Sequence, residues 1–385
     1  MSANLTGNSN TAVGRAALEA NTQSGNTAVG SQALTANTTG FSNSALGAQA
    51  LQSNVTGQGN TAVGASALTA NTASNNTAVG AQALGVNTTG DSNSALGNGA
   101  LRSNTTGASN TAIGVQAMDQ NTTGGSNTAI GRGALGANTA GTDNTAVGRN
   151  ALNANTASAN TAVGSSVLQA NTTGTAATAL GYLALSANTT GSFNTAVGSE
   201  ALAANTSGTT NTAVGQRALW KSTGASGNTA VGTSALANNI SGGSNTAVGV
   251  NALLVNTGSD NTGFGFEALR FNGGGTRNTG VGVRAAWSTS VSDNTAVGYQ
   301  ALQSTSIGAN NTGVGSQALS GNTTGTRNTS VGVQTLQASA AGSDSTAVGY
   351  RALASDTLGP STAVGAQALE ANTTGANNSA VGYQA

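Results

Sequence analysis

The side chains that could do chemistry are few, and they recur at the spacing of a repeat. Only 6% of the 385 residues are charged; Glu200 and Arg217 stand one repeat apart, as do Glu267 and Arg284. We interpret these as exposed cross-strand pairs that set the register of neighbouring strands. A catalytic carboxylate pair is the alternative interpretation, but no pattern typical of a pocket surrounds these residues. We therefore predict that the protein is not an enzyme.

Composition removes several further kinds of site. The chain has no cysteine and no histidine, which excludes disulfides, thiol chemistry, Cys/His zinc sites and histidine acid–base catalysis. The aspartates lack the spaced Asp-Gly pattern of calcium-binding β-rolls. Gly263-Phe264-Gly265 does not precede a helical pattern, so a phosphate cradle is not indicated. We expect no metal and no cofactor, and zero net charge predicts no nucleic-acid partner.

One run of departures from the repeat is the candidate contact patch. The position after the repeat glycine holds Val250, Phe266, Val283 and Tyr299 in four consecutive repeats, so stacking would place them in one apolar strip. Trp287 lies in the same stretch, and we add Trp220, an aromatic residue of a different repeat, to the candidate set. Such a patch would suit a receptor, a glycan or a neighbouring subunit. Local repacking is the alternative interpretation.

A single short motif must position all of these side chains. Asn-Thr-Ala-Val-Gly, or a close variant, occurs 23 times between Asn10 and Gly382, at 17-residue spacing sixteen times and 16-residue spacing six times. Fixed self-similarity of this kind predicts one elongated array over residues 1–385. Each repeat has two β-compatible runs, Asn-Thr-Ala-Val and Ala-Leu-x-Ala-Asn-Thr, separated by turn residues. We predict an all-β parallel β-roll or β-solenoid of about 23 coils, with 16–17 residues per coil.

The constant spacing between two apolar positions predicts the core. The valine and the leucine of each repeat are always five residues apart. The predicted core columns begin with Val13, Leu18, Val29, Leu34, Val63 and Leu68. Because strand residues alternate in direction, inward valines would turn the alanines outward, toward a neighbouring chain. One valine and one leucine make a thin core, so we expect a homotrimer packed or intertwined through the alanine column.

The repeat asparagine should satisfy its own polar groups by stacking. In-register coils place identical side chains about 4.8 Å apart, so stacked amides can bond to one another as in cross-β arrays. The predicted asparagine ladder begins with Asn10, Asn26, Asn43 and Asn60.

The motif resembles two groups of known proteins. Ala12-Val13-Gly14-Arg15-Ala16-Ala17 is similar to the head repeat of trimeric autotransporter adhesins, and Asn294 to Leu302 resembles repeats of phage tail-fibre shafts. The resemblance implies a trimeric left-handed parallel β-roll that binds host surfaces. The repeat is two or three residues longer than the usual adhesin repeat. A single-chain left-handed β-helix of the hexapeptide type is the competing fold.

These observations predict a structural or adhesive fibre shaft that gives length. Its expected partners are other copies of itself and a host-surface glycan or protein, at a cell surface or on a phage or virion fibre. No signal peptide or membrane-spanning run is visible, which favours the phage fibre. Neither end carries an atypical capping repeat, which predicts a piece of a longer array or covered ends. An ice-binding solenoid is one alternative, suggested by the threonine column that begins at Thr11. An acyltransferase or tailspike enzyme is the other.

Overall fold

The protein is a parallel β-solenoid of about 22 turns in a computed structural model that describes residues 7–385. The predicted fold class is confirmed, and residues 7–385 contain no helix. Residues 1–6, from which we expected no signal peptide, lie outside this range. The chain divides into two compact units, Met1–Phe193 and Asn194–Ala385, and each is described by itself.

Each coil contributes one three-residue strand to the main sheet of its unit. The strands of the first unit are β1 (Thr11–Val13), β2 (Thr27–Val29), β3 (Ser44–Leu46), β4 (Thr61–Val63), β5 (Thr77–Val79), β6 (Ser94–Leu96), β7 (Thr111–Ile113), β8 (Thr128–Ile130), β9 (Thr145–Val147), β10 (Thr161–Val163) and β11 (Thr178–Leu180). The main strands of the second unit are β12 (Thr195–Val197), β13 (Thr212–Val214), β14 (Thr229–Val231), β15 (Thr246–Val248), β17 (Thr262–Phe264), β19 (Thr279–Val281), β20 (Thr295–Val297), β21 (Thr312–Val314), β22 (Thr329–Val331), β23 (Thr346–Val348), β24 (Thr362–Val364) and β25 (Ser379–Val381).

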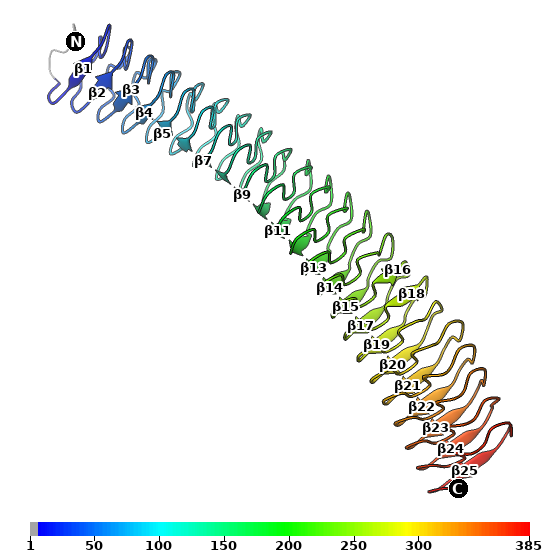
Figure 1. Cartoon of the computed structure of the whole chain (residues 1–385). Coiled ribbons are helices and arrows are strands. Elements are labelled where there is room, and N and C mark those ends of the chain that lie inside the picture. The colour runs from blue at the N-terminus through cyan, green and yellow to red at the C-terminus, as the bar shows by residue number, and fades with distance from the viewer. Residues whose placement is uncertain (1–6) are drawn as a thin grey trace. The chain divides into compact units, whose positions relative to one another are not determined.

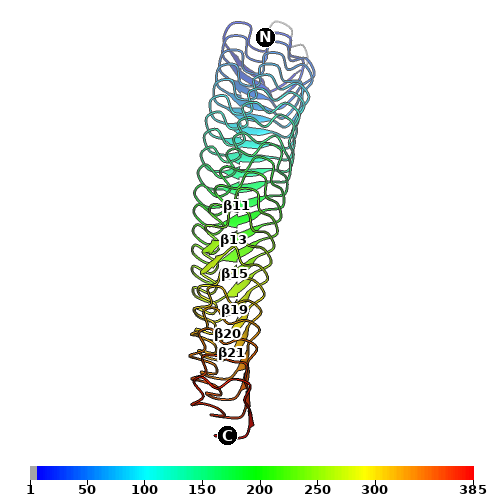
Figure 2. The same ribbon diagram turned by 90° about the vertical axis from the view of Figure 1, so that its right-hand side faces the viewer.

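Neighbouring coils pair in parallel and without slippage. Thr11 stands opposite Thr27, and Thr111 opposite Thr128, so most columns keep their residue type from coil to coil. In Figures 1 and 2 the coils of each unit follow one another in sequence order. The second unit has one further small sheet, formed by β16 (Val255–Asn256) and β18 (Phe271–Gly273). A hexapeptide-type helix would need three such strands in every coil, and residues 7–385 do not show them.

The interior is built from alanine and leucine. The prediction that the strand valines also lie in the interior is wrong. Leu18, Leu34 and Leu68 are fully buried, and the strand alanines from Ala28 to Ala363 are buried as well. Val13 is 57% exposed. Val29 and Val63 are only half-buried, and their column lies on the outer face of the sheet. The alanine column therefore does not face a neighbouring chain.

The leucine side chains explain why the strand turns this way. Where glycine replaces the strand alanine, a methyl group built on Gly280 would lie 3.0 Å from the leucine side chain of Leu269, and one on Gly263 would lie 3.3 Å from Leu253. The leucine of the preceding coil thus fills the space behind the strand. An alanine methyl fits there, whereas valine would overpack the interior.

The repeat glycine and the residues after it form the corner of the coil. Gly131 has a φ of 132°, and a Cβ on it would lie 2.6 Å from the carbonyl oxygen of Gly148 in the next coil. Both the backbone angle and the close approach require glycine. The second predicted strand, the Ala-Leu-x-Ala-Asn-Thr run, is a turn in most coils and a strand only at β16 and β18. The leucine of this run has a left-handed backbone conformation, with a φ of 50° at Leu135. An extended strand requires a negative φ, so the run cannot continue as a strand here.

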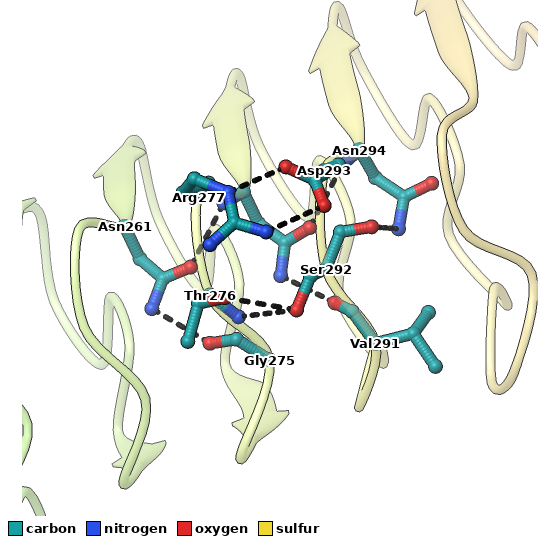
Figure 3. A network of polar contacts seen from close by, with 9 residues as sticks. Asn261, Gly275, Thr276, Arg277, Val291, Ser292, Asp293 and Asn294 are labelled. Atoms are coloured by element: carbon teal, nitrogen blue, oxygen red, sulfur yellow. Dashed lines mark hydrogen bonds and ion pairs between the residues drawn. The ribbon is translucent and has the colours of Figure 1, made fainter.

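Two asparagine columns run through the interior, one more than the sequence led us to expect. In the predicted column, the Asn26 side-chain oxygen accepts from the Asn43 backbone N–H at 3.0 Å, and the Asn43 amide donates to the Gly57 carbonyl at 2.8 Å. In the other column, the Asn54 amide donates to the Asn37 side-chain oxygen at 3.0 Å. Figure 3 shows Asn261 of the first column donating to the carbonyl of Gly275. These bonds satisfy polar groups that would otherwise be costly inside the coil.

Candidate functional site

The outer face of the main sheet is a regular surface of threonine and apolar side chains. Thr and Val of each strand point outward on either side of the buried alanine, and the valine position also holds Leu46, Ile113 and Phe264. Among the described residues, the strand threonine hydroxyls make no hydrogen bond to protein. Each unit therefore presents one column of free hydroxyl groups beside one column of exposed apolar side chains, which we call the threonine–valine face.

The four residues of the predicted strip do lie on consecutive coils. The N–H of Glu267 donates to the carbonyl of Val250 at 3.0 Å, and main-chain bonds of the same kind place Phe266 beside Val283, and Val283 beside Tyr299. All four side chains are exposed. The strip is thus continuous and accessible, and whether it contacts a receptor stays a prediction.

Trp287 lies in a cluster of aromatic and charged side chains that contact one another. Its ring meets that of Phe271 edge to face, with centroids 5.0 Å apart. Arg270 lies over Phe271, 5.0 Å from its centroid, and also contacts the carboxylate of Glu267. Arg284 of the next coil binds the same carboxylate, with Nε to Oε2 at 2.8 Å. We call these five residues the aromatic cluster; its buried Glu267 is held by two arginines, while the Trp287 indole N–H has no partner.

Trp220 is separate from both the strip and the aromatic cluster. Its half-buried ring contacts two cations, with the Arg217 guanidinium 5.1 Å and the Lys221 ammonium 5.3 Å from the centroid. Arg217 in turn binds Glu200 at 2.8 Å. The ring is therefore engaged by its own chain through cation–π contacts.

Ion pairs between adjacent coils organise most of the remaining charges. Residues 7–385 contain six pairs of this kind: Arg102–Asp119, Glu200–Arg217, Glu267–Arg284, Arg277–Asp293, Arg327–Asp344 and Arg351–Glu370. In Figure 3 Arg277 makes two parallel contacts with Asp293, at 2.7 and 2.8 Å. Hydrogen bonds from the arginines hold the pKa of Asp293 and that of Asp344 below the ordinary range. These pairs favour the in-register stacking of coils.

Asp356 is a polar site that sequence reasoning missed. It replaces asparagine in the second interior column, where the side chain is buried and one carboxylate oxygen has no hydrogen-bond partner. Burial raises the pKa of Asp356, and weak contacts from the N–H groups of Gly359 and Leu358 oppose that rise. The signal was available, because this position lies three residues after the leucine in every repeat, and it is usually asparagine.

Comparisons with known proteins do not assign this chain to a family. No protein-family model matches it, and no curated protein matches it either.

Within residues 7–385, no group of three or more acidic side chains converges in a way that could hold a metal ion. No helix of suitable length and apolarity for crossing a membrane occurs in that range.

Proposed function

We propose that this chain is a structural fibre shaft that gives length and presents a regular surface for assembly. The observation that carries the proposal is that coils stack in register, with the same backbone bonds to the coil before and the coil after. Thr111 bonds to Asn127, and Gly131 to Ile113, at the same positions and lengths that recur throughout. In such an array a further repeat adds length without a new kind of contact.

The threonine–valine face supports self-association as the second half of this proposal. Each coil buries only small alanines, one leucine and two asparagines, so a second buried surface would add stability that the single chain lacks. The valine, leucine and isoleucine column is apolar, and its side chains are exposed or half-buried along each unit. We assign the homotrimer contact to this face, in place of the alanine column, which is interior.

Sedimentation equilibrium tests the proposal. The wild-type chain should sediment as a trimer at micromolar concentration, and the double variant Ile113→Asp/Ile130→Asp should dissociate, because the trimer would bring six new carboxylates together. Val115→Asp is the matched control, since Val115 is equally exposed but lies outside the strand. A wild-type chain that stays monomeric would remove the self-association half of the proposal.

An ice-binding solenoid is the second candidate, and one observation favours it. An inward valine column would also have turned Thr11 inward, because the two residues share one side of the strand, but Thr11 and Val13 both lie on the exposed face. Threonine hydroxyls then repeat at the spacing of parallel strands, about 4.8 Å. A subunit contact and an ice contact would compete for the same face, so a trimer would count against this candidate.

Thermal hysteresis of the freezing point tests the ice-binding candidate. The candidate predicts hysteresis for the wild-type chain and its loss in Thr111→Lys/Thr128→Lys, whose side chains would disrupt the flat face. Thr123→Lys, an exposed loop threonine, is the control and should keep the activity. Absence of hysteresis in the wild-type protein would remove the candidate.

A further inference from the structure

A hollow in the first unit marks a place where two side chains of one coil are missing. Gly133 and Gly136 occupy positions that hold Gln116 and Asp119 in the preceding coil, and Asn150 and Asn153 in the next. The resulting depression has a volume of about 430 Å³. The Asn153 amide donates to the carbonyl of Gly133 at 2.8 Å and forms part of its floor. Its size is within the range of about 300–1,000 Å³ that is usual for small-molecule sites.

Two arginines line this hollow without a carboxylate partner. Arg132 and Arg149 occupy the same position in adjacent coils, since the residue after Arg149 donates its N–H to the Arg132 carbonyl at 3.0 Å. Neither is among the ion-paired arginines of the described residues. The one acid in the hollow, Asp119, is already bound by Arg102 at 3.0 Å.

This like-charged stack reverses the pattern of the rest of the chain. Six pairs elsewhere set opposite charges on adjacent coils, whereas Arg132 and Arg149 set two positive charges there. Like charges on neighbouring strands repel. An anion held between them would replace that repulsion by charge-assisted hydrogen bonds, for which the guanidinium group is well shaped.

The rest of the lining indicates what kind of anion fits. Gln116, Gln120 and Asn150 place amide groups around the hollow, and no aromatic side chain lines it. Amides both donate and accept hydrogen bonds, which suits the hydroxyl groups of a sugar, whereas a nucleobase would need a stacking ring. The lining is polar, so an apolar ligand is not favoured.

We propose that the arginine hollow, formed by Gly133 and Gly136 and lined by Arg132 and Arg149, binds a saccharide that carries a carboxylate. The carboxylate lies between the two guanidinium groups, and the amides of Gln116, Gln120 and Asn150 bind ring hydroxyls. The site belongs to one chain, so it is independent of the shaft proposal and of any subunit contact. It also lies outside the strip and the aromatic cluster, which belong to the second unit.

Calorimetric titration of the full chain with trigalacturonate, an acidic trisaccharide, tests the site. Saturable binding is expected for the wild type, with affinity at least tenfold weaker for Arg132→Gln/Arg149→Gln. Arg15→Gln is the matched control, because Arg15 also follows a repeat glycine and is exposed, but has no arginine in the next coil. Its affinity should equal that of the wild type. Both arginines of the double variant are exposed, so circular dichroism should show an unchanged fold.

Two further arms separate the parts of the proposal. Gly136→Asn fills the hollow and leaves both arginines, so it should weaken trigalacturonate binding while inorganic sulfate still binds. The neutral galactose trisaccharide should bind at least tenfold more weakly than the acidic one to the wild type. The proposal is overturned if the wild type does not bind trigalacturonate, if the double variant binds it equally well, or if the neutral sugar binds with the same affinity.

Discussion

The arginine hollow and the aromatic cluster occupy the same positions of the repeat but are filled in opposite ways. In the first unit Gly133 and Gly136 leave space, and two arginines stand unpaired beside it. In the second unit the corresponding positions hold Glu267 and Arg270, which pair with each other, and Arg284 of the next coil binds the same carboxylate. The interior columns run through both places, although at the aromatic cluster glycine replaces the strand alanine at Gly263 and Gly280, and Ala286 replaces the leucine. The coil thus tolerates large changes on its turn side because its fold depends on the interior columns and the glycine corner.

The largest expected loss of stability comes from replacing the corner glycine, and it tests whether both regions depend on the same glycine corner. Gly131→Ala and Gly265→Ala should each cost about 3 kcal/mol of unfolding free energy, because alanine disfavours a φ near 130° and its Cβ would meet the next coil's backbone within 2.6 Å. Urea unfolding with hydrogen exchange of the affected coils measures the loss. A tolerated alanine at either position would show that the regions do not share this corner.

The next effect should separate the two regions. Glu267→Gln should cost about 2 kcal/mol, because it leaves two arginines around a buried neutral amide. Arg132→Gln, at the hollow, should cause no loss of stability, since it removes a repulsion. Hydrogen exchange of the two segments reports each change locally. Equal losses at both sites would contradict the contrast drawn between them.

Asp356→Asn tests whether the interior columns set stability in the second unit as in the first. Asparagine at this position would restore the side-chain amide of the second asparagine column. We expect the free energy of unfolding to rise by about 1 kcal/mol at pH 7. Because the pKa of Asp356 is raised in the folded state, the folded protein holds its proton more tightly than the unfolded chain does. Wild-type stability should therefore fall as the pH rises from the ordinary aspartate range through the raised pKa.

Unfolding midpoints of the wild type and Asp356→Asn, measured from pH 4 to pH 7, follow this difference. The gain from asparagine should shrink as the pH falls toward 4, because the folded Asp356 carboxyl then keeps its proton and no longer places a charge in the interior. Asn372→Asp, at the same position in the next coil, is the reciprocal variant and should be less stable at pH 7 than at pH 4. A gain independent of pH would mean that the Asp356 carboxyl titrates normally.

The smallest effect concerns the exposed pairs that both the sequence and the structure place between coils. Asp293→Asn and Asp344→Asn should shift the unfolding midpoint only slightly, because exposed ion pairs contribute little. The pKa of each aspartate is lowered, so its contribution is present above the ordinary range and is lost as the pH falls through the lowered pKa. Thermal unfolding at pH 7 and pH 2 in low salt measures it; a large shift at pH 7 would contradict a surface role.

The sequence predicted the first strand of each coil, the parallel register and the first asparagine column, because a fixed repeat places identical residues side by side; its second strand is a turn in most coils. It did not predict which face of the strand is interior. Alternation shows that Thr11 and Val13 share a side, but not which side that is. The decision rests on the leucine side chains, which fill the space behind the alanines. The arginine hollow was equally hidden, since it depends on two glycines of one coil lying beside two arginines.

The facing of the strand is the central claim, and thiol labelling tests it most directly. The chain has no cysteine, so Ala146→Cys and Val147→Cys each introduce a single thiol. Ala146 is fully buried, and the column of Val147 faces outward. In dilute, dissociated protein, maleimide should modify the Val147→Cys thiol rapidly and leave the Ala146→Cys thiol protected until the coil unfolds. A protected thiol at 147 together with a reactive one at 146 would contradict the account.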